Sequence, residues 1–87
     1  MSDADGSLLK FPTDLAVKVF GRNLPEFRAA VTEIVEARFG TAYTVAEQES
    51  KQASYLSLTI TVRAESRAQA DALYQALVAH ELVLMAL

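Results

Sequence analysis

An α+β fold with four strands and two helices, in the order β-α-β-β-α-β, is predicted by three features of the 87-residue sequence. Residues 14–20 and 55–62 alternate apolar and polar side chains with the period of two that is typical of strands. The segments that follow these two strands carry apolar residues at the three- and four-residue spacing of amphipathic helices. The chain ends on an apolar segment, residues 82–87, which is long enough for one more strand.

The first half of the chain contributes a strand, a turn and a helix. The strand at residues 14–20 is expected to end at Gly21. Asn23 is expected to cap the helix, because Glu26 follows three residues later at the spacing of a capping box. Gly40 is typical of the position just after a helix. The inner stripe of this helix is predicted to contain Leu24, Phe27, Val31, Ile34 and Val35.

The second half repeats the pattern with an extra strand. Residues 43–49 predict a weaker strand that becomes polar toward its end, as an edge strand should. Residues 50–54 are a polar connection, and residues 55–62 are the clearest strand of the chain. Ser66 with Gln69 forms a second capping box before the second helix. The inner stripe of that helix is predicted to contain Ala70, Leu73, Tyr74, Leu77 and Val78.

The element order favours a ferredoxin-like sandwich, in which both helices cover one face of an antiparallel sheet. The strand order of this fold, 4-1-3-2, puts the two best alternating strands in the centre and the weakest strand at an edge. Residues 11–87 are therefore expected to form one domain. Residues 1–10 are expected to form a flexible tail, in which Leu8 and Leu9 pack against the edge of the domain.

Composition excludes several classes of function. The sequence has no cysteine, so disulfides, thiol nucleophiles and thiolate metal sites are excluded. The net charge of −3 disfavours a nucleic-acid binder that works by neutralising phosphates. The N-terminal segment lacks the features of a secretory signal, and no apolar run approaches the length of a membrane span. A cytoplasmic location is expected.

Five short motifs are distributed along the chain: F-P at residues 11–12, K-V-x-G at 18–21, L-P-E at 24–26, S-x-T-I-T at 57–61 and V-x-M-x-L at 83–87. Together they resemble the YbeD-like family of small bacterial proteins. The resemblance implies a ferredoxin-like, ACT-like fold in a group with no established activity and no assigned catalytic residues. It also implies a regulatory or adaptor role. The chain departs from the family in its longer acidic tail and at Leu84, where a polar residue is expected.

The first candidate site is the turn between the first strand and the first helix, with Gly21, Arg22 and Asn23 as ligand-binding residues. Gly21 is expected to allow close approach of a ligand, and the N–H groups around Arg22 and Asn23 are expected to point outward. The same stretch superficially suggests an acylphosphatase. That interpretation is disfavoured because Leu24 and Pro25 stand where a phosphate-binding loop needs glycines.

The second candidate is an interface on the face of the sheet that the helices leave bare. If Val83, Met85 and Leu87 point to the core, the apolar patch on this bare face contains Phe20, Tyr55, Leu82 and Leu84. A homodimer or a protein partner is expected on this patch. The alternatives are edge pairing through residues 43–49, cover by the N-terminal tail, and a last strand with the opposite orientation.

No catalytic constellation is present in the sequence. His80 is the only histidine and has no acidic or cysteine cluster around it, so neither a metal site nor a catalytic triad is expected. The sequence therefore predicts a non-catalytic regulatory or adaptor domain without a cofactor, which binds a small molecule or a protein. The alternative is single-stranded nucleic-acid binding, with bases stacked on Phe20 and Tyr55 beside Lys18.

Overall fold

The computed structural model describes residues 10–87. The predicted tail at residues 1–10, including the packing of Leu8 and Leu9, lies outside the described residues except for Lys10, which is exposed. The elements are β1 (Thr13–Arg22), α2 (Pro25–Phe39), β2 (Tyr43–Glu49), β3 (Tyr55–Ala64), α3 (Arg67–Val78) and β4 (Met85–Ala86). Their order is the predicted β-α-β-β-α-β.

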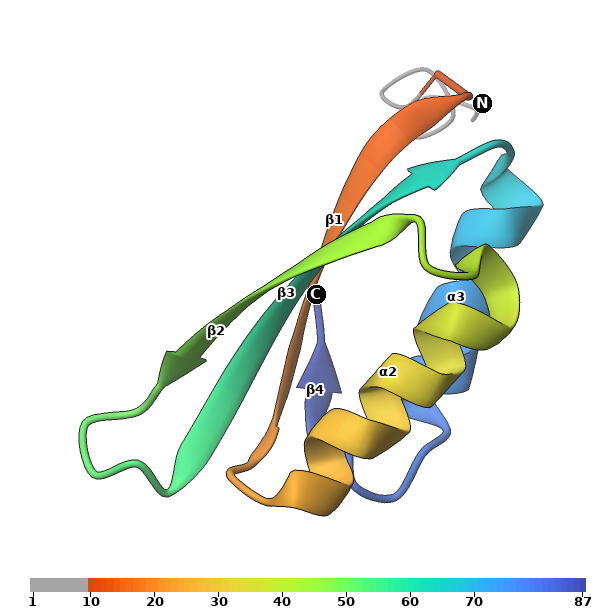
Figure 1. Cartoon of the computed structure of the whole chain (residues 1–87). Coiled ribbons are helices and arrows are strands. Elements are labelled where there is room, and N and C mark those ends of the chain that lie inside the picture. The colour runs from red at the N-terminus through yellow and green to blue at the C-terminus, as the bar shows by residue number, and fades with distance from the viewer. Residues whose placement is uncertain (1–9) are drawn as a thin grey trace.

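The four strands form one antiparallel sheet in the order β2-β3-β1-β4. This confirms the predicted ferredoxin-like topology and the predicted order 4-1-3-2. Strands β1 and β3 pair along all ten residues of each, from Thr13 opposite Ala64 to Arg22 opposite Tyr55. Figure 1 shows α2 and α3 side by side on one face of the sheet, so the other face has no helix over it.

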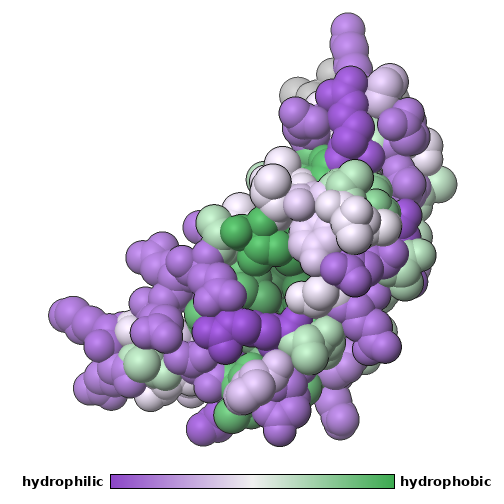
Figure 2. All heavy atoms as spheres, viewed as in Figure 1, coloured by the Kyte–Doolittle hydropathy of each residue, from purple (hydrophilic) through white to green (hydrophobic). Residues whose placement is uncertain are grey.

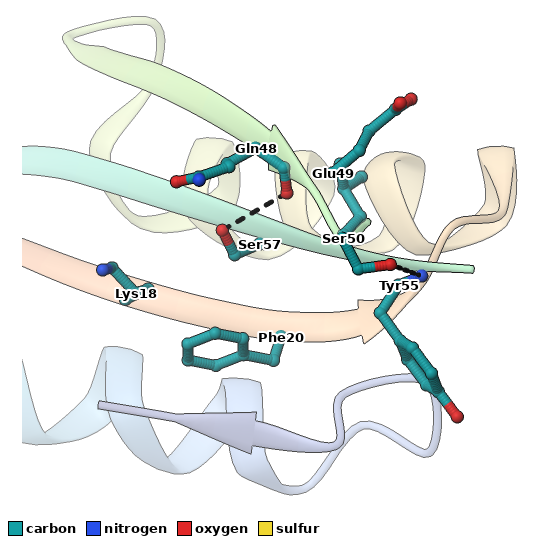
Figure 3. A pocket seen from close by; sticks show the side chains of 8 residues that line it. Lys18, Phe20, Gln48, Glu49, Ser50, Tyr55 and Ser57 are labelled. Carbon is teal, nitrogen blue, oxygen red and sulfur yellow. Dashed lines mark hydrogen bonds between the residues drawn. The ribbon is translucent and has the colours of Figure 1, made fainter. Parts of the chain in front are cut away.

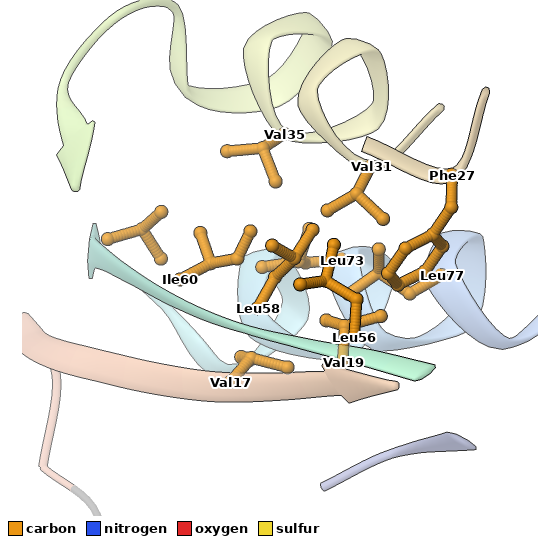
Figure 4. Packing of buried hydrophobic residues seen from close by; sticks show 11 residues of the cluster. Val17, Val19, Phe27, Val31, Val35, Leu56, Leu58, Ile60, Leu73 and Leu77 are labelled. Carbon is orange, nitrogen blue, oxygen red and sulfur yellow. The ribbon is translucent and has the colours of Figure 1, made fainter. Parts of the chain in front are cut away.

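The hydrophobic core lies between the sheet and the two helices (Figure 4). Alternation along β1 and β3 buries every second side chain, as the period of two predicted. The fully or almost fully buried members of the cluster are Val17, Val19, Phe27, Val31, Val35, Leu56, Leu58, Ile60, Val62, Leu73 and Leu77. Burial of each such side chain contributes roughly 1.5–3 kcal/mol, which is what holds the helices on this face.

The N-cap predicted from the sequence is observed for α3 and not for α2. Ser66 caps α3 by accepting a hydrogen bond of 3.1 Å from the Gln69 N–H, as predicted, while the Gln69 carboxamide accepts from the Glu65 N–H. The predicted cap of α2 is wrong, because its N-cap is Leu24 and no side chain caps it. The Asn23 side-chain amide instead donates to the Ala53 carbonyl in the β2–β3 connection and to Glu49 Oε2 at the end of β2.

Three boundaries or faces differ from the prediction. Strand β1 continues through Gly21 to Arg22, because β3 pairs with it over that length. Leu24 and Val78, which were assigned to the inner stripes, are exposed. Leu24 is the N-cap residue of α2 and Val78 is the last residue of α3, so each lies at a helix terminus.

The last strand is shorter than predicted, and the side chains within it point to the opposite faces of the sheet from those assumed. Only Met85 and Ala86 pair regularly with β1, and Ala86 packs against the core while Met85 shares the face of Phe20. The reason is the tight turn after α3, in which His80 Nδ1 accepts from the Leu82 N–H at 3.1 Å and the His80 carbonyl accepts from the Val83 N–H at 3.0 Å. Leu82 and Val83 therefore pack on the core before the strand begins.

Candidate functional site

The uncovered face of the sheet is organised in rows that run across the strands. One row contains Gln48 of β2, Ser57 of β3, Phe20 of β1 and Met85 of β4. The row toward the end of β1 contains Tyr55 and Arg22, and the row on the other side contains Ala46, Thr59 and Lys18. Leu87 lies beside Lys18, since their backbone groups exchange two hydrogen bonds of 3.1 and 2.8 Å. We call Lys18, Phe20, Arg22, Gln48, Tyr55, Ser57, Met85 and Leu87 the open face.

A shallow hollow of about 290 Å³ lies in the open face over Ser57. It exists because Ser57 is small and stands in one row between two longer side chains, Gln48 and Phe20. The rest of its lining consists of Lys18, Glu49, Ser50, Tyr55 and Leu56 (Figure 3). The carboxylate of Glu49 accepts a hydrogen bond of 3.2 Å from the Asn23 side-chain amide. The Ser57 hydroxyl donates to the Gln48 carbonyl at 3.4 Å, and Ser50 Oγ accepts from the Tyr55 N–H at 3.1 Å. The floor of the hollow is thereby fixed by local hydrogen bonds.

Apolar side chains surround the hollow and remain exposed to solvent. Tyr55 is 49% exposed, Met85 48% and Leu87 60%, and Phe20 is half-buried. The prediction that Phe20 and Tyr55 share this face is correct. Leu82 is not part of it, because it packs against the core, and Leu84 is exposed just before β4.

The predicted patch depended on the condition that Val83, Met85 and Leu87 point to the core, with the opposite orientation as an alternative. Val83 packs against the core, whereas Met85 and Leu87 are exposed. The signal that identifies them is the small size of Ala86, the residue between them. Ala86 lies opposite Val19 and packs against the core, so its two larger neighbours point the other way.

Charge is distributed unevenly between the two faces of the sheet. Of the three acidic residues in the described strands, only Asp14 has the orientation of the open face, and it is paired with Arg63 at 3.3 Å. Glu47 and Glu49 point to the helix side, in register with the buried Leu58 and Leu56. Among the described residues, neither Lys18 nor Arg22 has a carboxylate partner. The open face is thus locally cationic in a chain whose net charge is −3.

The turn predicted to bind a ligand is occupied by contacts within the chain. A Cβ atom added to Gly21 would lie 2.5 Å from the Phe27 ring and 2.8 Å from the Leu82 carbonyl oxygen, so this glycine permits close packing. The Asn23 N–H donates to the Ser54 carbonyl at 3.0 Å, and its side-chain amide donates to Glu49 Oε2 and to the Ala53 carbonyl. The prediction that the Asn23 N–H points outward is wrong. Arg22 alone of the three residues is exposed, and its side chain belongs to the open face.

Polar bridges connect α2 and the turn before it to β2. Arg28 donates two hydrogen bonds to Glu47, at 3.0 and 3.1 Å, and the Tyr43 hydroxyl donates to Glu36 at 2.6 Å. Figure 2 shows hydrophobic side chains gathered in the hollowed middle of the surface between the sheet and α2. Val45 of β2, on the helix side of the sheet, is exposed. These hydrogen bonds hold α2 and β2 in place on either side of this apolar surface, so we assign them a structural role.

The Tyr43–Glu36 hydrogen bond has a measurable consequence at high pH. The bond to the carboxylate, helped by partial desolvation, raises the pKa of Tyr43 above its usual value of 10.0. Because this pKa is higher in the folded chain, its stabilising contribution is present below about pH 10 and is lost as the pH rises through the folded-state pKa. We expect Glu36→Gln to lower the pKa of Tyr43, measured by NMR of ¹³C-labelled tyrosine. An identical titration curve in both proteins would contradict the bond.

Residues 10–87 contain neither a cluster of metal-ligating side chains nor a membrane-spanning helix. No three His, Cys, Asp or Glu side chains are grouped there so that they could hold a metal ion. Neither of the two helices in this range has the length and apolar character needed to cross a membrane.

Comparison with known proteins assigns the chain to a family. Residues 6–87 match the family model described as "Protein of unknown function (DUF493)". The chain belongs to the DUF493 family. The resemblance to YbeD-like proteins is thereby confirmed, and DUF493 membership brings no established activity with it.

Curated relatives of this DUF493 chain carry the name UPF0250 protein. One from Bordetella parapertussis is 45% identical over 80 residues, which cover 88% of this chain and 87% of the relative. Another, from Paraburkholderia phytofirmans, is 37% identical over 86 residues, with 95% and 96% covered. The solution structure of protein HP0495 from H. pylori superposes with a TM-score of 0.80 at 15% identity, covering 100% of this chain and 93% of that one. The last similarity shows the fold alone.

Proposed function

We propose that this DUF493 chain is a non-catalytic regulatory or adaptor module whose open face binds a protein partner. The observation that carries the proposal is that Tyr55, Met85 and Leu87 are exposed around two cations without carboxylate partners, on a face that no described residue covers. An exposed apolar patch with a polar rim is typical of a protein interface. Aromatic residues and arginine, which the patch supplies, often dominate binding energy at such interfaces.

The absence of catalysis is proposed from the chemistry of the same face. Its hydroxyl groups at Ser50 and Ser57 are engaged with the backbone, and the one histidine lies in the turn after α3, where its Nδ1 accepts from the Leu82 N–H. Activation of a nucleophile needs a general base within hydrogen-bond reach. Glu49 is the neighbour of Ser50 in the chain, and its carboxylate accepts from the Asn23 side-chain amide at 3.2 Å; no hydrogen bond joins it to either serine among the described residues.

A second copy of this chain fits the open face less well than an acidic partner does. Two copies packed face to face by a two-fold axis would bring Lys18 and Arg22 of each together, and like charges at an interface oppose association. The homodimer expected from the sequence stays a prediction, and β2, at the free edge of the sheet, is the route that this charge arrangement leaves open.

Affinity capture from extracts of cells that make the protein tests the proposal. The bait variant Phe20→Ser with Met85→Ser removes apolar surface from the open face. The control bait, Leu24→Ser with Val78→Ser, removes exposed apolar residues from the helices. By quantitative mass spectrometry, we expect a partner that the wild-type and control baits retain and that the open-face variant retains about tenfold less. Equal retention of all proteins by the three baits, each with a normal melting curve, would refute the proposal.

Single-stranded nucleic acid is a second candidate for the same surface. The specific observation is that Phe20 and Tyr55 lie in adjacent rows beside Lys18 and Arg22, which combines stacking surfaces with cations. Base stacking on an aromatic side chain is worth about 1–3 kcal/mol. This candidate requires that fluorescence anisotropy detect binding of a labelled single-stranded RNA at low salt, and that Phe20→Ala weaken it. No change in anisotropy at low salt removes it.

A further inference from the structure

We propose that the partner presents an amphipathic acidic helix, which places one apolar side chain over Ser57 and carboxylates beside Lys18 and Arg22. The inference rests on the proposed function and names the chemistry of the partner. It follows from the shape of the hollow, from the spacing of the two cations and from the fact that neither cation has a carboxylate partner among the described residues.

The shape of the hollow fits a side chain that is part of a larger element. Its volume of about 290 Å³ is at the lower limit for a small-molecule pocket, for which roughly 300–1,000 Å³ is usual. It opens on the sheet surface and covers only one side of its occupant. A free small molecule would stay largely in contact with solvent there. A side chain whose backbone lies across Phe20, Tyr55 and Met85 would be covered on both sides.

The cations flank the hollow at a spacing that a helix can match. Lys18 and Arg22 are four residues apart on β1, or about 13 Å at the rise of a strand, and Phe20 lies midway between them. A helix rises about 1.5 Å per residue, so acidic residues eight or nine positions apart span a similar distance. An apolar residue midway between them falls one turn from each. The expected recognition pattern is therefore an apolar residue with an acidic residue about four positions away on either side.

A helical partner also satisfies the hydrogen-bonding groups of its own backbone. The middle of a sheet face offers side chains and no free N–H or C=O groups, so an extended segment laid on it would leave its own backbone groups unpaired. A helix bonds these groups internally and presents an apolar stripe. Packing one on the open face would give the sheet helices on both sides.

Selection from a random peptide library displayed on mRNA tests the inference with the whole protein as bait. We expect enriched peptides to be acidic, helical and apolar at a position between the acidic residues. Their affinity, measured by fluorescence anisotropy, should fall about tenfold or more with Ser57→Tyr, which fills the hollow, and with Lys18→Glu. Binding should weaken as the salt concentration rises.

Matched variants separate the site from general effects. Thr61→Tyr is the control for Ser57→Tyr, because it adds the same ring to the same face of β3, two rows away from Ser57. Lys10→Glu is the control for Lys18→Glu, because it changes the net charge equally at a residue outside β1. Both should bind the selected peptides as the wild type does. Enrichment of neutral or basic peptides, no enrichment, or equal binding to Ser57→Tyr would overturn the inference. If affinity capture still yields a partner whose retention depends on Phe20 and Met85, the proposed function remains valid even though the inference of an acidic helix is wrong.

Discussion

Phe27→Ala is expected to remove a large part of the stability of the domain. Phe27 is fully buried at the start of α2 and contacts the core beneath the β1–α2 turn. Truncation of a buried phenylalanine costs about 3–5 kcal/mol, while the whole free energy of unfolding expected for a chain of this length is roughly 4–13 kcal/mol. Urea unfolding followed by circular dichroism should show the loss as a much lower midpoint.

Leu24→Ala is the matched control for Phe27→Ala, since Leu24 precedes the same helix and is exposed. Its effect should stay within about 0.5 kcal/mol, as is usual for surface positions. Similar midpoints for the two variants would mean that Phe27 is not the residue that fixes α2 on the sheet.

Gly21→Ala is expected to destabilise the fold by overpacking. The added methyl group would meet the Phe27 ring at 2.5 Å and the Leu82 carbonyl oxygen at 2.8 Å, and one of these neighbours is backbone. Forcing a methyl group into a packed site typically costs 1–3 kcal/mol. Because most of the clash is with the ring, the same substitution should cost less in a Phe27→Ala background, and urea unfolding of the four proteins measures this coupling.

Gly40→Ala provides the comparison for Gly21→Ala. Gly40 has a φ of 63°, and a Cβ atom there would meet nothing within 4 Å, so its cost arises from backbone strain. Its effect should therefore be the same with or without the Phe27 ring. Equal costs of Gly21→Ala in both backgrounds would contradict the packing explanation for Gly21.

The fold was predictable because period and turn chemistry are local properties of the sequence. The alternation in β1 and β3 and the Ser66 cap each depend on neighbouring residues, and together they permit one familiar arrangement. The orientation of β4 was not predictable in this way. It depends on where the chain leaves the turn at His80, and both orientations of residues 82–87 place apolar side chains on each face.

The candidate site was predicted in part for the same reason. Phe20 and Tyr55 were placed correctly because their strands have clear periodicity. Met85 and Leu87 were missed because β4 was reversed, and the role of Asn23 was missed because its partners, Glu49 and Ala53, lie far along the chain. The hollow itself depends on the register of three strands at Ser57, which sequence patterns do not specify.

The most direct test of the account is to map, by ¹⁵N NMR, where a captured partner or selected peptide binds. Amide shifts are expected to change most at Lys18, Phe20, Tyr55, Ser57 and Met85, on strands β1, β3 and β4. Changes centred instead on Asn23 and Leu24 or on the surface between α2 and β2, with the open face unaffected, would contradict it.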